Sequence, residues 1–115
     1  MAKYDPTLDR VFTALGDPTR RTILARLAQG PASVSELAAP HAMSLPSFLG
    51  HLARLETAGL VTTAKLGRIR TCTLVPNAFC PAQDWLSAQR SLWQDRLDQF
   101  DAYVTTLIKD RDHEA

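Results

Sequence analysis

The first thirty residues contain two short runs in which apolar side chains recur three or four positions apart, the spacing of one face of an α-helix. The first run predicts a helix that ends at Gly16, and its apolar positions are Leu8, Val11, Phe12 and Leu15. Asp17 and Pro18 then match an N-cap followed by proline at the first helical position. They predict a second helix that closes at Gly30 and whose apolar positions are Ile23, Leu24 and Leu27.

Residues 33–58 have the pattern of a helix-turn-helix. Ser33 and Glu36 are three positions apart, as in a capping box, and predict a short helix that a proline ends. After a turn of roughly four residues, Ser44 matches the N-cap of a longer helix, and Gly59 provides its left-handed stop. A short helix, a turn and a longer helix in this order predict a DNA-binding helix-turn-helix.

Residues 61–74 predict a β-hairpin directly after that motif. Two β-prone runs, Val61–Lys65 and Ile69–Leu74, are joined by a short segment in which Gly67 allows a tight turn. A hairpin in this place is a wing. We expect it to present basic side chains at its tip, namely Lys65, Arg68 and Arg70.

An uninterrupted helical pattern extends from about residue 82 to residue 109, roughly 42 Å at 1.5 Å per residue. Apolar side chains recur along it at the a/d spacing of a coiled coil, and we name them the α-helical seam: Leu86, Trp93, Leu97, Phe100, Val104 and Leu107. An intramolecular hairpin is the alternative, but the chain offers no second long helix for it. The seam therefore predicts a homodimer that forms through the terminal helices.

Together these elements predict a mainly α-helical winged helix-turn-helix with a β-hairpin wing, and 115 residues suit a single domain, 1–115. The net charge is only +1, but residues 10–75 carry eight basic and three acidic side chains. A basic body suits a partner rich in phosphate. The first ten residues have no apolar signal segment and no stretch could span a membrane, so we expect a cytoplasmic protein.

The residues themselves resemble the ArsR/SmtB family of dimeric bacterial repressors, over about positions 8 to 107. The phrases that carry the resemblance are those at residues 14–21, 35–38, 51–61 and 67–68. The resemblance implies a winged-helix homodimer that binds duplex DNA and that an effector, often a metal ion or a redox signal, usually releases from it.

The helix after Ser44 has two faces when it is turned at 100° per residue. Leu45, Phe48, Leu52 and Leu55 are expected on the core side, and the opposite side carries Pro46, Ser47, Gly50, Ala53, Arg54 and Thr57. We expect Ser44 and Ser47 to contact bases or phosphate, and Gly50 to allow close approach of the backbone.

Phosphate contacts are assigned to Arg20, Arg21, Arg54, Arg68 and Arg70, with Lys65 beside them. The resemblance implies polar residues where Leu49 and Gly50 stand, which weakens direct base readout. His51, at the edge of the core side, is interpreted as a packing and hydrogen-bonding residue.

The chain lacks the Cys-x-Cys and Asp-x-His patterns of metal-sensing relatives, so we expect no metal, and no cofactor or catalytic motif is recognised. Cys72 alternates in phase with Leu74 and is expected to point inward, whereas Cys80 precedes the long helix and is the better candidate for oxidation, with Cys72 as its possible partner. Two alternatives stay open. One is a thiol-redox-responsive repressor, and the other is a winged-helix module that binds a protein and binds DNA only weakly.

Overall fold

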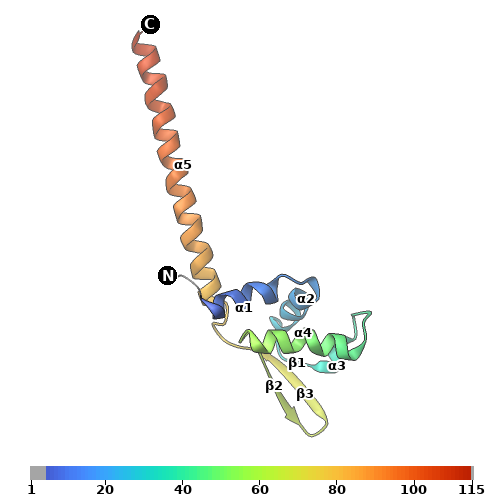
Figure 1. Ribbon diagram of the computed structural model, residues 1–115. Helices are drawn as coiled ribbons and strands as arrows, with labels where there is room; N and C mark the ends of the chain where they lie inside the picture. Colours follow the sequence, from blue (N-terminus) through green and yellow to red (C-terminus); the bar gives the residue numbers. More distant parts are fainter. Residues whose placement is uncertain (1–4, 115) are drawn as a thin grey trace. The chain divides into compact units, whose positions relative to one another are not determined.

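The computed structural model describes residues 5–114, with side chains through residue 112, and the chain divides into two units (Figure 1). The first unit runs to Ala82 and the second begins at Gln83. The sequence pattern predicted one domain over residues 1–115. The chain separates at this point because the described residues beyond it belong to a single helix, which has no core of its own.

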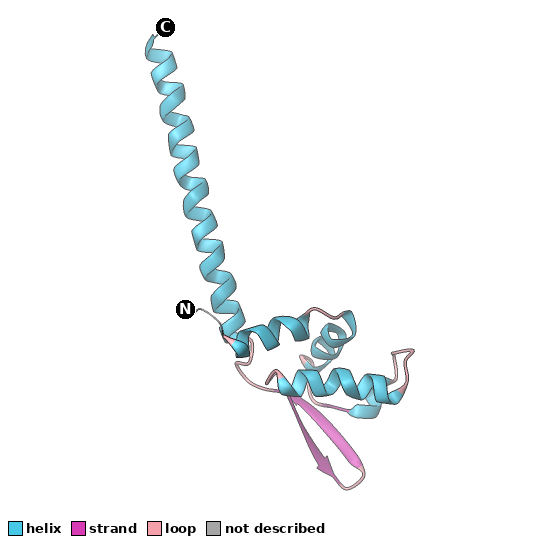
Figure 2. Cartoon of the chain, viewed as in Figure 1, coloured by secondary structure: helices cyan, strands magenta, loops and turns pink. Residues whose placement is uncertain are grey.

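The first unit combines short helices with a three-stranded sheet (Figure 2). Its described elements follow one another as α1 (Pro6–Leu15), α2 (Pro18–Leu27), β1 (Ala32–Ser33), α3 (Val34–Ala38), α4 (Leu45–Thr57), β2 (Val61–Leu66) and β3 (Ile69–Leu74). The hairpin of β2 and β3 projects away from the helices. Helix, turn, helix and hairpin thus occur in the predicted order.

The helices of this unit begin at capping side chains. The side chains of Asp17, Ser33 and Ser44 each accept a hydrogen bond from a backbone N–H in the first turn of α2, α3 and α4, which confirms the three predicted starts. At Ser33 both halves of the capping box are present. Asp5 caps α1 in the same way, with Pro6 after it; this start repeats the Asp17–Pro18 pattern and was missed.

The sheet has the strand order β1-β3-β2, and all its pairs are antiparallel. In the hairpin Val61 pairs with Leu74 and Leu66 with Ile69, and Gly67 takes a φ of +63° in the turn between them, as predicted. The third strand, β1, was not predicted. Only two residues long, it shows no alternation in the sequence and is defined solely by its pairing with β3.

The core of the first unit lies between the helices and the sheet. Phe48, Leu52 and Leu55 of α4 are buried there as predicted. Leu45 is not: it is 56% exposed, because it stands at the first position of α4, before the part of the helix that packs. Leu49, half-buried, packs against the core instead. The resemblance implied a polar residue where Leu49 stands, and the packing of Leu49 against the core accounts for an apolar one.

Helix α5 (Cys80–Glu114) begins at the end of the first unit and makes up the described part of the second. It extends the predicted helix, 82–109, at both ends, and its 35 residues correspond to about 52 Å. None of the described helices is both long and apolar enough to cross a membrane.

Candidate nucleic-acid interface

Ser44 and Ser47 organise the N-terminal end of α4. The Oγ of Ser44 accepts a hydrogen bond from the backbone N–H of Ser47, at 3.3 Å, and donates one to the Oγ of Ser47, at 3.0 Å. Because Ser44 uses its hydroxyl proton in this contact, the Ser47 hydroxyl keeps its own proton for an outside acceptor. Ser44 is therefore a capping residue, and Ser47 is the donor that this end of the helix offers to a ligand.

One side of α4 is exposed along its whole length, and we call it the α4 outer face: Pro46, Ser47, Gly50, Ala53, Arg54 and Thr57. Its position opposite the buried side is as predicted. A Cβ added at Gly50 would meet nothing within 4 Å, so packing inside this chain does not require a glycine there. A glycine in a helix interior costs about 1 kcal/mol relative to alanine. Within the described residues, no packing contact offsets this cost at Gly50.

The six cations predicted to contact DNA fall into two groups. Within the described residues, Arg54, Lys65 and Arg68 make no side-chain hydrogen bond and no ion pair, and all three are exposed. We call them the free cations. The other three, Arg20, Arg21 and Arg70, are engaged by groups of the protein.

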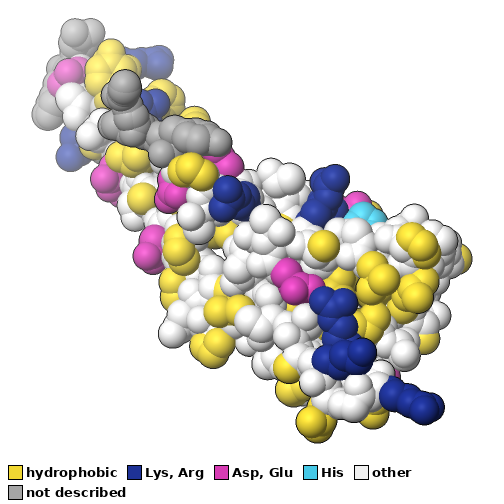
Figure 3. Space-filling model, turned by 60° about the horizontal axis from the view of Figure 1, so that its bottom comes forward, with side chains coloured by type: hydrophobic (Ala, Val, Ile, Leu, Met, Phe, Trp, Pro, Cys, Tyr) yellow, Lys and Arg dark blue, Asp and Glu magenta, His cyan; other side chains and the backbone are white. Residues whose placement is uncertain are grey.

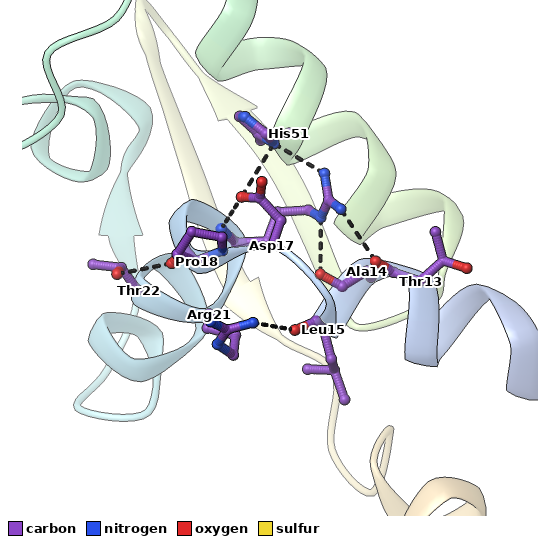
Figure 4. A network of polar contacts seen from close by, with 9 residues as sticks. Thr13, Ala14, Leu15, Asp17, Pro18, Arg21, Thr22 and His51 are labelled. Carbon is purple, nitrogen blue, oxygen red and sulfur yellow. Dashed lines mark hydrogen bonds and ion pairs between the residues drawn. The ribbon is translucent and has the colours of Figure 1, made fainter.

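Arg20 is the most deeply engaged of these, because it is only 7% exposed. Its Nε donates to the carbonyl oxygen of Ala14 at 2.8 Å, and its Nη2 donates to that of Thr13 at 3.1 Å. Its Nη1 lies 3.0 Å from Nδ1 of His51 (Figure 4). The interpretation of Arg20 as a phosphate contact therefore does not fit the structure. A guanidinium directed at the end of α1 and at α4 supports packing between these helices.

Asp17 completes this network from the start of α2. Its Oδ2 accepts the backbone N–H of Arg20 at 3.1 Å and lies 3.6 Å from Nδ1 of His51. The hydrogen bond from the backbone of Arg20, together with the nearby charges of His51 and Arg20, lowers the pKa of the Asp17 carboxyl below its ordinary value of 3.8, against the opposing effect of desolvation. His51 is half-buried and bonded, as the sequence analysis predicted.

Arg70 was predicted to stand at the tip of the wing, but its side chain is held against the body. Its Nη2 lies 3.3 Å from Oε1 of Glu56, on α4, and its Nε donates to Oγ1 of Thr63 at 3.2 Å. The sequence could not show this contact, since residues 56 and 70 meet only when the hairpin folds back toward α4. Arg21 is exposed, and its Nη1 donates to the carbonyl oxygen of Leu15 at 2.7 Å.

The surface of the first unit reflects this distribution. Figure 3 shows Lys and Arg side chains in several separate groups across the face turned forward, with hydrophobic side chains between them. A shallow hollow of about 420 Å³ borders the α4 outer face and is lined by Asp17, Arg20, Ser47, Gly50, His51 and Arg54. The network around Arg20 thus lies directly behind the exposed positions of α4.

The two cysteines differ in their surroundings. Cys72 is fully buried in the core, as predicted, and this burial raises the pKa of its thiol. Cys80 is exposed at the start of α5, and its Sγ lies 4.0 Å from Oδ1 of Asn77. A high pKa disfavours the thiolate. The thiol of Cys72 is therefore neither accessible to solvent nor readily ionised, and a redox partner needs both.

Among the described residues no three His, Cys, Asp or Glu side chains lie together as a set of metal ligands.

The predicted seam residues lie on α5 with their side chains outside any core. Leu86, Leu97 and Leu107 are 53%, 53% and 45% exposed, and Trp93 and Phe100 are both 63% exposed. Val104 is half-buried. A row of large apolar side chains that are exposed in this way indicates an interaction site.

Comparison with known proteins gives consistent relatives. A family model described as a helix-turn-helix domain matches residues 15–64. The HTH-type transcriptional regulator Rv2034 of Mycobacterium tuberculosis is 46% identical over 71 residues, which cover 62% of this chain and 66% of that protein. The crystal structure of an ArsR family transcriptional regulator, RHA00566, is similar with a TM-score of 0.76 and 49% identity, over 82% of this chain and 97% of that one.

A third relative carries information on assembly. The solution structure of a homodimeric winged helix-turn-helix DNA-binding domain, Mb0332 from Mycobacterium bovis, is similar with a TM-score of 0.59 and 27% identity. The match covers 80% of this chain and 94% of that one.

Proposed function

Because this chain belongs to the ArsR family of transcriptional regulators, we propose that it is a homodimeric repressor that binds a palindromic operator in duplex DNA. One observation carries the proposal. The free cations Arg54, Lys65 and Arg68 are exposed on α4 and the hairpin, where no described side chain neutralises them. Unpaired guanidinium and ammonium groups beside a helix-turn-helix favour contact with phosphate.

The α4 outer face would meet the major groove. Ser47 has a hydroxyl proton to donate to a base edge, and Gly50 leaves the helix backbone open to close approach. Pro46 and Ala53 offer small apolar surfaces that suit the methyl group of thymine. The face has few polar groups, so direct hydrogen bonds to bases would supply only part of the specificity.

The second copy of the chain would pack on α5. Its seam exposes large apolar side chains that a single helix cannot bury, and the a/d spacing matches a partner helix of the same sequence. The homodimeric state of the relative from Mycobacterium bovis supports this assembly. Two-fold symmetry then implies two half-sites about one helical turn of DNA, or a multiple of it, apart.

The test is a titration of purified protein with duplex DNA from its own upstream region at several salt concentrations. Three free cations in each of two subunits would neutralise about six phosphates, so log K should fall with log[salt] with a slope of about −5. A reporter gene behind the same region should lose expression when the protein is supplied. Absence of duplex binding at low salt would overturn the proposal, and retained binding to a protein partner would then favour the interaction module.

A further inference from the structure

Leu66 and Ile69 lie opposite each other at the end of the wing, and both side chains are exposed. They are directly paired across the hairpin, on either side of the turn at Gly67 and Arg68. Leu66 is 84% exposed and Ile69 is 59% exposed. We call this pair the tip pair. Large aliphatic side chains this exposed at the tip of a projecting hairpin bury little apolar surface on folding, which points to a role in binding.

The tip pair lies on the hairpin face that turns away from the core. Side chains alternate along a strand, so Leu66 shares its face with Ala64, and Ile69 shares its face with Thr71, the partner of Ala64. Lys65 and Arg70 form the intervening pair on the opposite face, which continues inward to buried Cys72. Folding of this unit therefore does not account for the tip pair.

The charges around the tip pair select the kind of partner. Arg68 lies in the turn between its two residues, and Lys65 precedes Leu66; both belong to the free cations. Glu56 is the carboxylate paired with Arg70, and Glu36 borders a shallow groove that Arg68, Ile69 and Arg70 also line. Apolar side chains set between unpaired cations fit a partner with an anionic backbone and an apolar interior, as duplex DNA has in its phosphates and stacked bases.

We propose that the tip pair is an apolar wedge that enters the minor groove of the operator. The inference rests on the proposed function, because it takes α4 to occupy the neighbouring major groove. The major groove is about 12 Å wide and admits a helix, whereas the minor groove is about 6 Å wide. Two strands lie about 4.8 Å apart before their side chains are added, so only the end of a hairpin fits the narrower groove.

A wedge of this kind reads DNA by deformation. Leucine and isoleucine between base steps partly unstack them and bend the duplex, at lower cost where the step is flexible. Specificity arises without hydrogen bonds to bases. This fits an α4 outer face that has few polar groups, and Arg68 would hold the wedge in place by its contact with phosphate.

The test uses a duplex recovered by the wild-type protein from a random pool. The double variant L66T/I69T has β-branched, strand-favouring side chains at both positions but removes the apolar tip. A64T changes the same face two residue pairs nearer the body, and L66M/I69L keeps the tip apolar; both serve as matched controls. Adenines are replaced one at a time by 2,6-diaminopurine, which adds an amino group to the minor groove and leaves the major-groove edge of the pair unchanged.

Wild-type protein should lose roughly tenfold in affinity at one or two substituted pairs in each half-site. L66T/I69T should bind the unmodified duplex roughly tenfold more weakly and show no further loss at those pairs, whereas both controls should behave as wild type. The single variant L66T changes the more exposed residue of the tip pair and should also bind the unmodified duplex more weakly. Thermal unfolding of each variant verifies that the fold is kept.

The experiment distinguishes failure of the proposed function from failure of the wedge alone. If the wild-type protein recovers no duplex and shows no salt-dependent binding, the proposed function fails and the wedge fails with it. If the wild-type protein binds but L66T/I69T has equal affinity, or loses as much as wild type at the substituted pairs, the wedge is wrong and the proposed function stands.

Discussion

Nη1 of Arg20 lies 3.0 Å from Nδ1 of His51, and this contact joins α2 to the helix that carries the proposed DNA-binding face. The same guanidinium holds two carbonyl oxygens near the end of α1. One buried side chain thus links three helices. Gly50, next to His51 in the chain, lies on the α4 outer face, so this network contributes to the orientation in which α4 meets DNA.

Arg20→Ala should lower the free energy of unfolding by about 2–3 kcal/mol, because it removes a buried side chain that donates to the carbonyl oxygen of Ala14 and contacts His51. The salt dependence of DNA binding should keep its slope, since Arg20 does not contact phosphate. Denaturant unfolding and the salt titration measure the two effects. Arg21→Ala is the matched control; its exposed side chain should cost under about 1 kcal/mol. A lower slope with unchanged stability would contradict the assignment of Arg20.

Gly50→Ala should raise the free energy of unfolding by about 0.5–1 kcal/mol, because alanine favours the helix and its Cβ meets nothing within 4 Å. Affinity for the operator should nevertheless fall, since the new methyl group holds DNA away from the backbone. Thermal unfolding and a binding titration test the two halves separately. Ala53→Gly, one turn later on the same face, should lose a similar amount of stability. Unchanged affinity in Gly50→Ala would exclude close approach at this position.

Arg54→Ala and Arg68→Ala should each weaken DNA binding and make the salt slope less negative by about two, because a dimer loses two phosphate contacts at once. Arg26→Ala is the control. Its guanidinium donates to the carbonyl oxygen of Gly30 and pairs with Glu36, so the slope should not change. Sedimentation should find dimers in all cases. Normal binding by both Arg54→Ala and Arg68→Ala would show that the DNA face lies elsewhere.

Trp93→Asp should weaken the dimer by roughly 30-fold or more, because the seam would then bury a charge without a partner. Sedimentation across a range of concentrations measures the change. Ser91→Asp introduces the same charge on the exposed opposite side of α5 and should leave the dimer intact. An unchanged dimer in Trp93→Asp would show that the subunits associate through another surface.

The thiols should react at very different rates. Cys80 is exposed and should be labelled by a maleimide in the folded protein, whereas Cys72 should react at least about tenfold more slowly, because burial limits access and raises its pKa. Mass spectrometry of native and unfolded protein distinguishes the two sites, with Cys80→Ser as the control. The redox alternative requires more: peroxide must release DNA from the wild-type protein and not from Cys80→Ser. Equal labelling of both thiols would show that the core opens readily.

The sequence alone was sufficient for the order of elements and for most of their ends. Capping serines and aspartates, prolines in first turns and glycines with positive φ act through contacts within a few residues, so Ser33, Ser44 and Gly67 could be interpreted without a fold. The buried side of α4 followed from its period, apart from Leu45 at the helix start. The spacing of the apolar side chains along α5 could be predicted from the sequence for the same reason.

The tertiary structure alone decided which cations are available. Arg20, Arg54 and Arg70 look equivalent in the sequence, yet one is buried against α1 and α4, one is free, and one is paired with Glu56. These contacts join residues between 6 and 31 positions apart, across elements whose packing no local pattern encodes. Helices and turns follow from short-range physics, whereas the free charge on a surface depends on which partners the completed fold brings within reach.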